Sequence, residues 1–147
     1  MPQIQIYSET MLMSMKTGPH IVNITPLLND MLHRLDFDEG VLHLFVQGST
    51  GSVTTVEYEP GAVEDLRRVI NGLAPPGASY EHEKAWHDGN GHSHVQAALL
   101  GPSVSVPIRR GKLATGTWQQ VVLINHDVRP RERRVEATIM GTKSAGA

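Results

Sequence analysis

A histidine-rich stretch between residues 80 and 94 is the part of the sequence best suited to chemistry. The 147-residue chain has eight histidines, five of which lie at His82, His87, His92, His94 and His126. Imidazole is the commonest metal ligand in proteins, and three nearby imidazoles could form a facial set with open positions. If His94 lies in a first helical turn, free N–H groups beside it would suit a phosphate. The stretch indicates either metal-assisted chemistry on a phosphorylated substrate or a solvated loop that happens to contain histidines.

Two further segments could bind an anion. The glycine-rich turn 48–52 could cradle a phosphate with its backbone N–H groups, or it could be a plain hairpin or bulge. It lacks the lysine and the spacing of a P-loop. Four arginines between residues 129 and 134 could clamp a phosphate or carboxylate, or they could form a solvated basic loop.

Two single residues are also candidates for a site. Glu57 is a candidate catalytic acid, although such a residue usually lies on a surface or caps a helix. Trp118 could stack on a substrate ring, although a tryptophan in a strand is more often part of the core.

The composition limits the classes of function. The chain has no cysteine, so any metal must be held by His, Asp or Glu, and no disulfide framework exists. The formal net charge of −2 gives no reason to expect nucleic acid as a partner. No run of about 18 apolar residues predicts a membrane span, and no signal peptide is visible, so we expect a cytoplasmic protein.

The elements that must position these residues predict an α+β fold. Apolar residues recur at helical spacing after Thr25-Pro26 and after Pro60-Gly61, and a shorter helix is expected over 93–100. Residues 80–91 are expected to form a loop. Strands are expected at 4–7, 20–22, 41–46, 53–57, 104–108, 118–125 and 135–140. Strands and helices do not alternate regularly, which favours one domain over residues 1–141 with a largely antiparallel sheet and a disordered tail at 142–147.

Several motifs together resemble the YjbQ family, small trimeric proteins described as secondary thiamine-phosphate synthases. The similarity covers nearly the whole chain. The motifs that carry it are Tyr80-Glu81-His82, Asn90-Gly91-His92-Ser93-His94-Val95, Leu99-Leu100-Gly101-Pro102-Ser103, Gly116-Thr117-Trp118-Gln119 and Arg133-Arg134-Val135.

The resemblance implies a twisted antiparallel sheet curled toward a barrel, flanking helices and a homotrimer. It implies an activity that joins a hydroxymethylpyrimidine pyrophosphate to a thiazole phosphate and releases pyrophosphate. His82 and His94 would hold a divalent ion, zinc or a similar metal. Glu57 and His92 would be catalytic, and the phosphorylated substrate would be bound by Asn90, Ser93, Trp118, Arg133 and Arg134.

One departure from the family pattern concerns the metal. Gly48 stands where the family has a histidine, so the expected set of three histidines is incomplete unless His92, His87 or water fills the gap. Three interpretations therefore stay open. The chain could be a metal-dependent transferase, a diverged non-catalytic trimer that binds a metabolite or anion in the same pocket, or a metal-dependent hydrolase.

Overall fold

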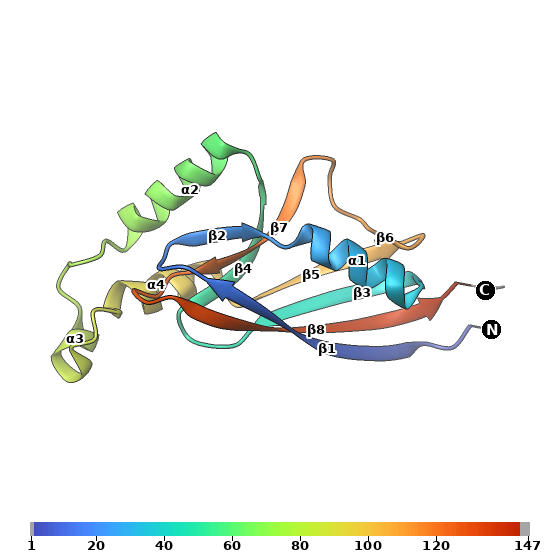
Figure 1. Cartoon of the computed structure of the whole chain (residues 1–147), viewed down its shortest axis with the longest axis horizontal. Helices are drawn as coiled ribbons and strands as arrows, with labels where there is room; N and C mark the ends of the chain where they lie inside the picture. Colours follow the sequence, from blue (N-terminus) through green and yellow to red (C-terminus); the bar gives the residue numbers. More distant parts are fainter. Residues whose placement is uncertain (1, 145–147) are drawn as a thin grey trace.

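Two antiparallel sheets form the frame of the computed structural model, which describes residues 2–144 (Figure 1). The larger sheet has the order β1-β8-β3-β5-β6, with bounds Gln5–Met15, Arg131–Lys143, Phe37–Val46, Ser103–Arg109 and Lys112–Leu113. The smaller sheet has the order β2-β7-β4, with bounds His20–Asn23, Gln119–Asn125 and Gly51–Glu57. All pairings of these strands are antiparallel, and the long strands twist and curl, so the predicted α+β class is confirmed.

The core lies between the larger sheet, the smaller sheet and helix α1 (Thr25–Leu35). On β8 the alternation of a strand directs Val135, Ala137 and Ile139 inward and leaves the residues between them partly or fully exposed. Helix α2 (Pro60–Leu73) covers the other face of the smaller sheet, where Ile70 packs against a second buried cluster. Among residues 2–144, no helix lies over the outer face of the larger sheet (Figure 1).

Local signals explain where the two predicted long helices begin and end. Pro26 occupies the first turn of α1, and Asp36 in the left-handed conformation ends it. The carboxylate of Glu59 accepts hydrogen bonds from the N–H groups of Gly61 and Ala62, which caps α2. Both predicted helices are confirmed. A third, α4, spans Gly91–Leu100 and begins slightly earlier than expected.

The expected loop over 80–91 is wrong in its first half. Helix α3 spans Glu81–Trp86 and has no buried residue, so no apolar stripe existed for the sequence to reveal. Its first turn carries Glu81 and Glu83, whose charges favour a helix N-terminus.

Strand β8 also differs from its prediction at both ends. It begins at Arg131, inside the expected basic loop, because Arg131 pairs with Met15 of β1. It continues through Thr142 and Lys143, which the sequence assigned to the tail, while residues 145–147 lie outside the described part. Among the described residues, no helix is long and apolar enough to cross a membrane.

Candidate functional site

The loop between α3 and α4 is held in place by hydrogen bonds to its backbone. Glu83 accepts from the N–H groups of Gly89 and Gly91, both at 2.9 Å, and so places a carboxylate at the start of α4. The ring of Tyr80 packs directly on Gly91, where a Cβ atom would lie 2.5 Å from the Tyr80 Cβ. These contacts set α3 and α4 side by side and bring their histidines together.

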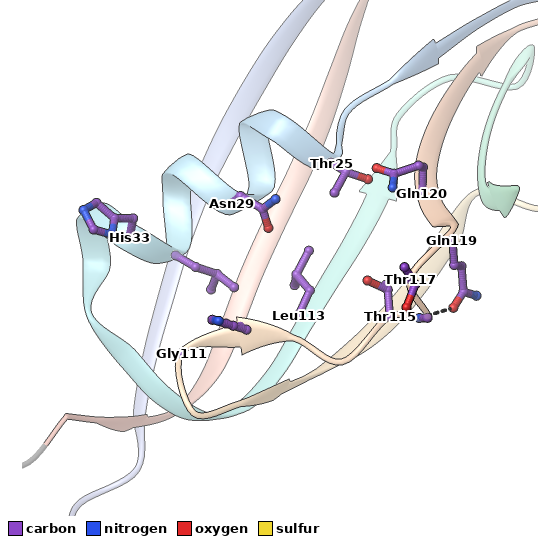
Figure 2. Close-up of a pocket in the computed structure, with 12 residues that line it drawn as sticks. Thr25, Asn29, His33, Gly111, Leu113, Thr115, Thr117, Gln119 and Gln120 are labelled. Atoms are coloured by element: carbon purple, nitrogen blue, oxygen red, sulfur yellow. Dashed lines mark hydrogen bonds between the residues drawn. The ribbon is translucent and has the colours of Figure 1, made fainter. Parts of the chain in front are cut away.

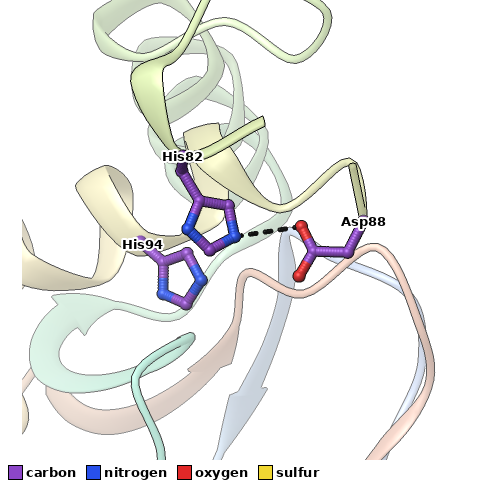
Figure 3. A group of neighbouring side chains, drawn as sticks. All are labelled: His82, Asp88 and His94. Carbon is purple, nitrogen blue, oxygen red and sulfur yellow. Dashed lines mark hydrogen bonds and ion pairs between the residues drawn. The ribbon is translucent and has the colours of Figure 1, made fainter. Parts of the chain in front are cut away.

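Three side chains on these elements form a group that could hold a metal ion (Figure 3). His82 of α3, Asp88 of the loop and His94 of α4 each offer one ligand atom, and these atoms lie within 4.8 Å of one another. His82 Nε2 lies 3.1 Å from Asp88 Oδ1, and the two imidazole centroids are 4.4 Å apart. Tetrahedral zinc with such ligands needs donor separations of about 3.3 Å, so small side-chain rotations would suffice. Three protein ligands leave a fourth position for water or substrate.

Asp88 is the candidate metal ligand that the sequence did not reveal. The sequence led us to expect His92, His87 or water as the third member of the group, whereas in this geometry the third member is the carboxylate of Asp88. Asp88 accepts the N–H of Asn90 at 3.0 Å, a local turn typical of aspartate, and this bond together with His82 holds the pKa of its carboxyl below the ordinary value. The sequence Asp88-Gly89-Asn90 is typical of such a turn and was the one signal that could have indicated the position of this carboxylate.

A polar hollow of about 330 Å³ lies beside this group, and Arg133 forms part of its wall. Arg133 is only 5% exposed. Its Nη2 donates to Thr50 Oγ1 at 2.6 Å and to Asn125 Oδ1 at 2.5 Å, whereas its buried Nε has no hydrogen-bond partner in the described part of the chain. Burial lowers the pKa of the guanidinium below its ordinary value. The Nε is enclosed against Gly51, whereas Nη1 lies beside Gly48 of the lining and is the guanidinium atom placed to contact an anion.

Asp127 organises the part of the wall next to Arg133, to which it is linked through their shared partner Thr50. Its carboxylate accepts from Thr50 Oγ1 at 2.9 Å, from Arg131 Nε at 3.0 Å, from the Arg129 N–H at 2.9 Å and from Asn90 Nδ2 at 3.2 Å. Burial acts to raise the pKa of this carboxyl, but these hydrogen bonds outweigh it and hold the pKa below its ordinary value. Asn90 thus lines the hollow, as predicted for a binding residue, with its side chain already engaged.

The formal charge of the hollow depends on a metal. Its charged lining residues are two arginines and three carboxylates, which are Arg131, Arg133, Asp88, Asp127 and Glu132. With His94 neutral, the lining carries one net negative charge. A divalent cation at the three-ligand group would change that to one net positive charge, which an anion requires.

A buried hydrogen-bond network fixes α4 behind the site. His126 is 1% exposed, and its Nε2 lies 2.8 Å from Ser52 Oγ. Its Nδ1 lies 2.9 Å from Gln96 Oε1, while Gln96 Nε2 donates to Asn71 Oδ1 and to the Ala74 carbonyl, both at 3.0 Å. Because Gln96 Nε2 donates to two acceptors, the amide oxygen Oε1 is the atom that faces His126 and must accept a hydrogen bond. Nδ1 of His126 therefore carries the proton, and Nε2 accepts from the Ser52 hydroxyl. Burial, then the positive charges of Arg133 and His92, lower the pKa of His126 to about 4.

Two predicted residues on α4 lie outside the hollow. His92 is buried on another side of the helix, since residues two apart on a helix point apart, and burial lowers its pKa. The hydroxyl of Ser93 is fully buried and donates to the His126 carbonyl at 2.6 Å. Of His92, Ser93 and His94, only His94 belongs to the group of candidate metal ligands.

Three other predicted residues are not brought to the site. Arg134 points to the outer face of the larger sheet, near Glu136. Glu57 pairs with Gln119 at the far end of β4, about 20 Å from Gly51 at 3.3 Å per residue. Trp118 precedes Gln119 at that same end and is 73% exposed. Neither Glu57 nor Trp118 can therefore contact a ligand held by His82 and His94 of the same chain.

A larger hollow of about 540 Å³ lies at that far end, between α1 and the segment that leads into β7 (Figure 2). Asn29 faces it from α1, His33 lies at its edge on the same helix, and Gln119 lines it while accepting the Gly116 N–H at 3.0 Å. It has no carboxylate in its lining, and the one group of potential metal ligands among residues 2–144 lies elsewhere. We therefore assign the candidate site to the smaller hollow.

Comparisons with known proteins agree with the fold and the motifs. A family model described as "UPF0047 protein YjbQ-like" matches residues 9–142. A UPF0047 protein YjbQ of Escherichia coli O157:H7 is 32% identical over 137 residues, which cover 92% of this chain and 98% of that protein. A UPF0047 protein of Methanothermobacter thermautotrophicus is 29% identical over 138 residues, 94% of each chain.

Solved structures give the same result. A YbjQ-like protein of unknown function from Sulfolobus solfataricus P2 has a TM-score of 0.89 at 29% identity, over 95% of this chain and 99% of that one. An uncharacterized conserved protein of the yjbq/upf0047 family from Clostridium acetobutylicum has a TM-score of 0.77 at 29% identity, over 88% of this chain and 98% of that one. The chain therefore belongs to the YjbQ-like UPF0047 family.

Proposed function

We propose that the hollow beside His82, Asp88 and His94 binds a divalent metal ion, zinc or a similar one, together with the phosphate or pyrophosphate group of a small molecule. The observation that carries the proposal is the adjacency of a three-ligand group and the guanidinium of Arg133, whose Nη1 lies beside Gly48 in the wall of the same hollow. We further propose the reaction implied by the motifs, the joining of a hydroxymethylpyrimidine pyrophosphate to a thiazole phosphate.

The electrostatics of the hollow support this pairing of metal and anion. The guanidinium of Arg133 would neutralise part of the charge on a departing pyrophosphate. Arg131, held by Asp127, offers a second cation at the same wall. A bound metal ion would supply Lewis-acid stabilisation of the leaving oxygen.

The chemistry of the condensation requires no general base. The thiazole nitrogen attacks the methylene carbon of the pyrimidine with a lone pair, so a C–N bond forms and no proton must be removed. The C–O bond breaks, and the pyrophosphate leaves with the electron pair. Among the described residues that line the hollow, His94 is the one histidine, and it belongs to the proposed ligand set.

The test is a zinc titration followed by a pyrophosphate-release assay with the two phosphorylated substrates. Wild type should bind one zinc per chain, whereas His82→Ala, Asp88→Asn and His94→Ala should each lose zinc affinity and turnover. His87→Ala is the matched control, because His87 is exposed and outside the ligand group. Zinc binding that is unchanged in all three ligand variants would refute the proposed site.

A non-catalytic anion-binding role is the second candidate, and Gly48 favours it. The chain lacks the histidine that the family pattern has at this position, so a site changed in its ligands could retain binding without turnover. Zinc and pyrophosphate binding without product formation would support this alternative. Release of inorganic phosphate from the pyrophosphate substrate alone would instead favour a hydrolase.

We also propose that the chain assembles as a homotrimer, with further copies covering the outer face of the larger sheet. That face carries exposed apolar side chains at Ile6, Leu12 and Met140. Apolar groups clustered on an uncovered sheet face favour association.

A further inference from the structure

A second hollow adjoins the candidate site and has the opposite character. Its volume is about 510 Å³, and it lies between the end of β3 and helix α4. Its side-chain lining is mainly apolar and comprises Phe45, Val46, Ala97, Ala98 and Pro102. Such a surface suits the apolar part of a ligand.

The two hollows meet at shared residues. Gly48, Ser49 and His94 line both the apolar hollow and the polar hollow that contains Arg133. The proposed metal ligand His94 therefore stands at the junction, with the anion-binding wall on one side and the apolar surface on the other.

Gly48 keeps this junction open. Its φ of +104° lies in the region that L side chains rarely adopt. A Cβ atom at this position would lie 2.8 Å from Nη1 of Arg133, so any side chain would displace the guanidinium and project into the junction.

We propose that the natural ligand is an organic phosphate or pyrophosphate whose apolar body lies in the hollow between β3 and α4, and that Gly48 is the residue that determines this specificity. The proposal rests on the proposed function, because it takes the anion site beside the metal ligands as given. It adds the class of the organic group and the residue that admits it. The ligand would span the junction, with its phosphate toward Arg133 and its apolar body against Ala97 and Ala98.

The probes that test this are inorganic phosphate and phenyl phosphate, titrated calorimetrically into the zinc-loaded full chain. Burial of part of the phenyl ring should make phenyl phosphate bind about tenfold more tightly than phosphate, since about 1.4 kcal/mol corresponds to tenfold. Ala98→Phe fills the apolar hollow from an exposed helix position and should abolish this advantage, so that the two probes bind with equal affinity. Leu99→Phe is the matched control on the same helix, because Leu99 is exposed and does not line the hollow.

Gly48→Asn tests the junction itself. Asparagine tolerates positive φ better than other residues with a side chain, and thermal unfolding checks that the variant is folded. Because its side chain would displace the guanidinium and project into the junction, it should weaken the binding of both probes and bring their affinities closer together. An unchanged advantage of phenyl phosphate in this variant would overturn the role given to Gly48. Equal affinity of both probes in wild type, or an advantage that survives Ala98→Phe, would overturn this inference while leaving the proposed function standing. Failure of zinc-loaded wild type to bind either probe would overturn both.

Discussion

The buried His126 should make the stability of this protein depend steeply on pH below neutrality. Its pKa is lowered to about 4 in the folded chain, whereas an unfolded chain has the ordinary value of 6.5. Between these values the unfolded state binds more protons than the folded state. Stability is therefore fully present above pH 6.5 and falls as the pH drops toward 4.

The size of the effect follows from these two pKa values. Proton linkage gives a loss of about 2 kcal/mol on going from pH 7 to pH 5, and about 3 kcal/mol on going to pH 4. Asp127, whose pKa lies below its ordinary value of 3.8, adds its own loss only at more acidic pH, where its carboxylate becomes protonated. A loss near pH 5 thus reports on the histidines.

The assay is urea unfolding followed by circular dichroism at several pH values between 7 and 4.5. His126→Gln should be less stable than wild type at pH 7 by about 1–3 kcal/mol, because Gln96 loses a buried partner. Its stability should nevertheless decline less with falling pH, and the residual decline would come from His92 and His20, whose pKa values burial also lowers. His33→Gln, at an exposed histidine, is the control and should keep the wild-type slope. Equal slopes in His126→Gln and wild type would refute the reasoning.

Four further predictions concern the site and the assembly. Asp88→Asn should weaken zinc binding by about tenfold or more, measured by competition with a chromophoric chelator, because a ligand loses its charge. Removal of zinc with a chelator should abolish pyrophosphate binding to wild type, and persistence of tight binding would contradict the charge balance of the hollow. Arg133→Ala should cost about 1.5–3 kcal/mol of pyrophosphate affinity, whereas Arg134→Ala should change it by less than about 0.5 kcal/mol, and equal losses would contradict their opposite orientations. Light scattering should give about three times the chain mass, and Met140→Arg on the outer face should lower it, whereas a monomeric wild type would exclude the trimer.

The parts of the fold that the sequence predicted are those with strong local signals. Pro26 and Pro60 mark two helix starts, and the apolar stripes behind them set the length of each helix. Helix α3 has neither a proline start nor a buried face, so only its contacts through Glu83 and Tyr80 define it. These contacts are made with residues of the following loop and helix. The spacing of apolar residues along the sequence carries no information about such contacts.

The candidate site was predictable in its histidines and not in its other members. His82 and His94 belong to recognisable motifs, whereas the choice between His92 and His94 depends on the phase of α4. The choice between Arg133 and Arg134 likewise depends on whether the basic segment is a loop or a strand, and pairing with β1 makes it a strand. Trp118 belongs to a motif as distinctive as the histidines, but the length of β7 carries it to the opposite end of the molecule.

The alternation along β8 limits how the sequence of this protein can change over time. Deletion of a single residue just before Arg131, with the pairing positions kept, would move every later side chain of the strand to the other face. Arg134 would then enter the hollow in place of Arg133, but Val135 and Ile139 would be turned to solvent. Because the strand lies between β1 and β3, both neighbours resist such a shift. We therefore expect insertions and deletions among relatives to occur mainly in connections such as that between α2 and α3. The chain is largely exposed there, and no strand pairing would be disturbed.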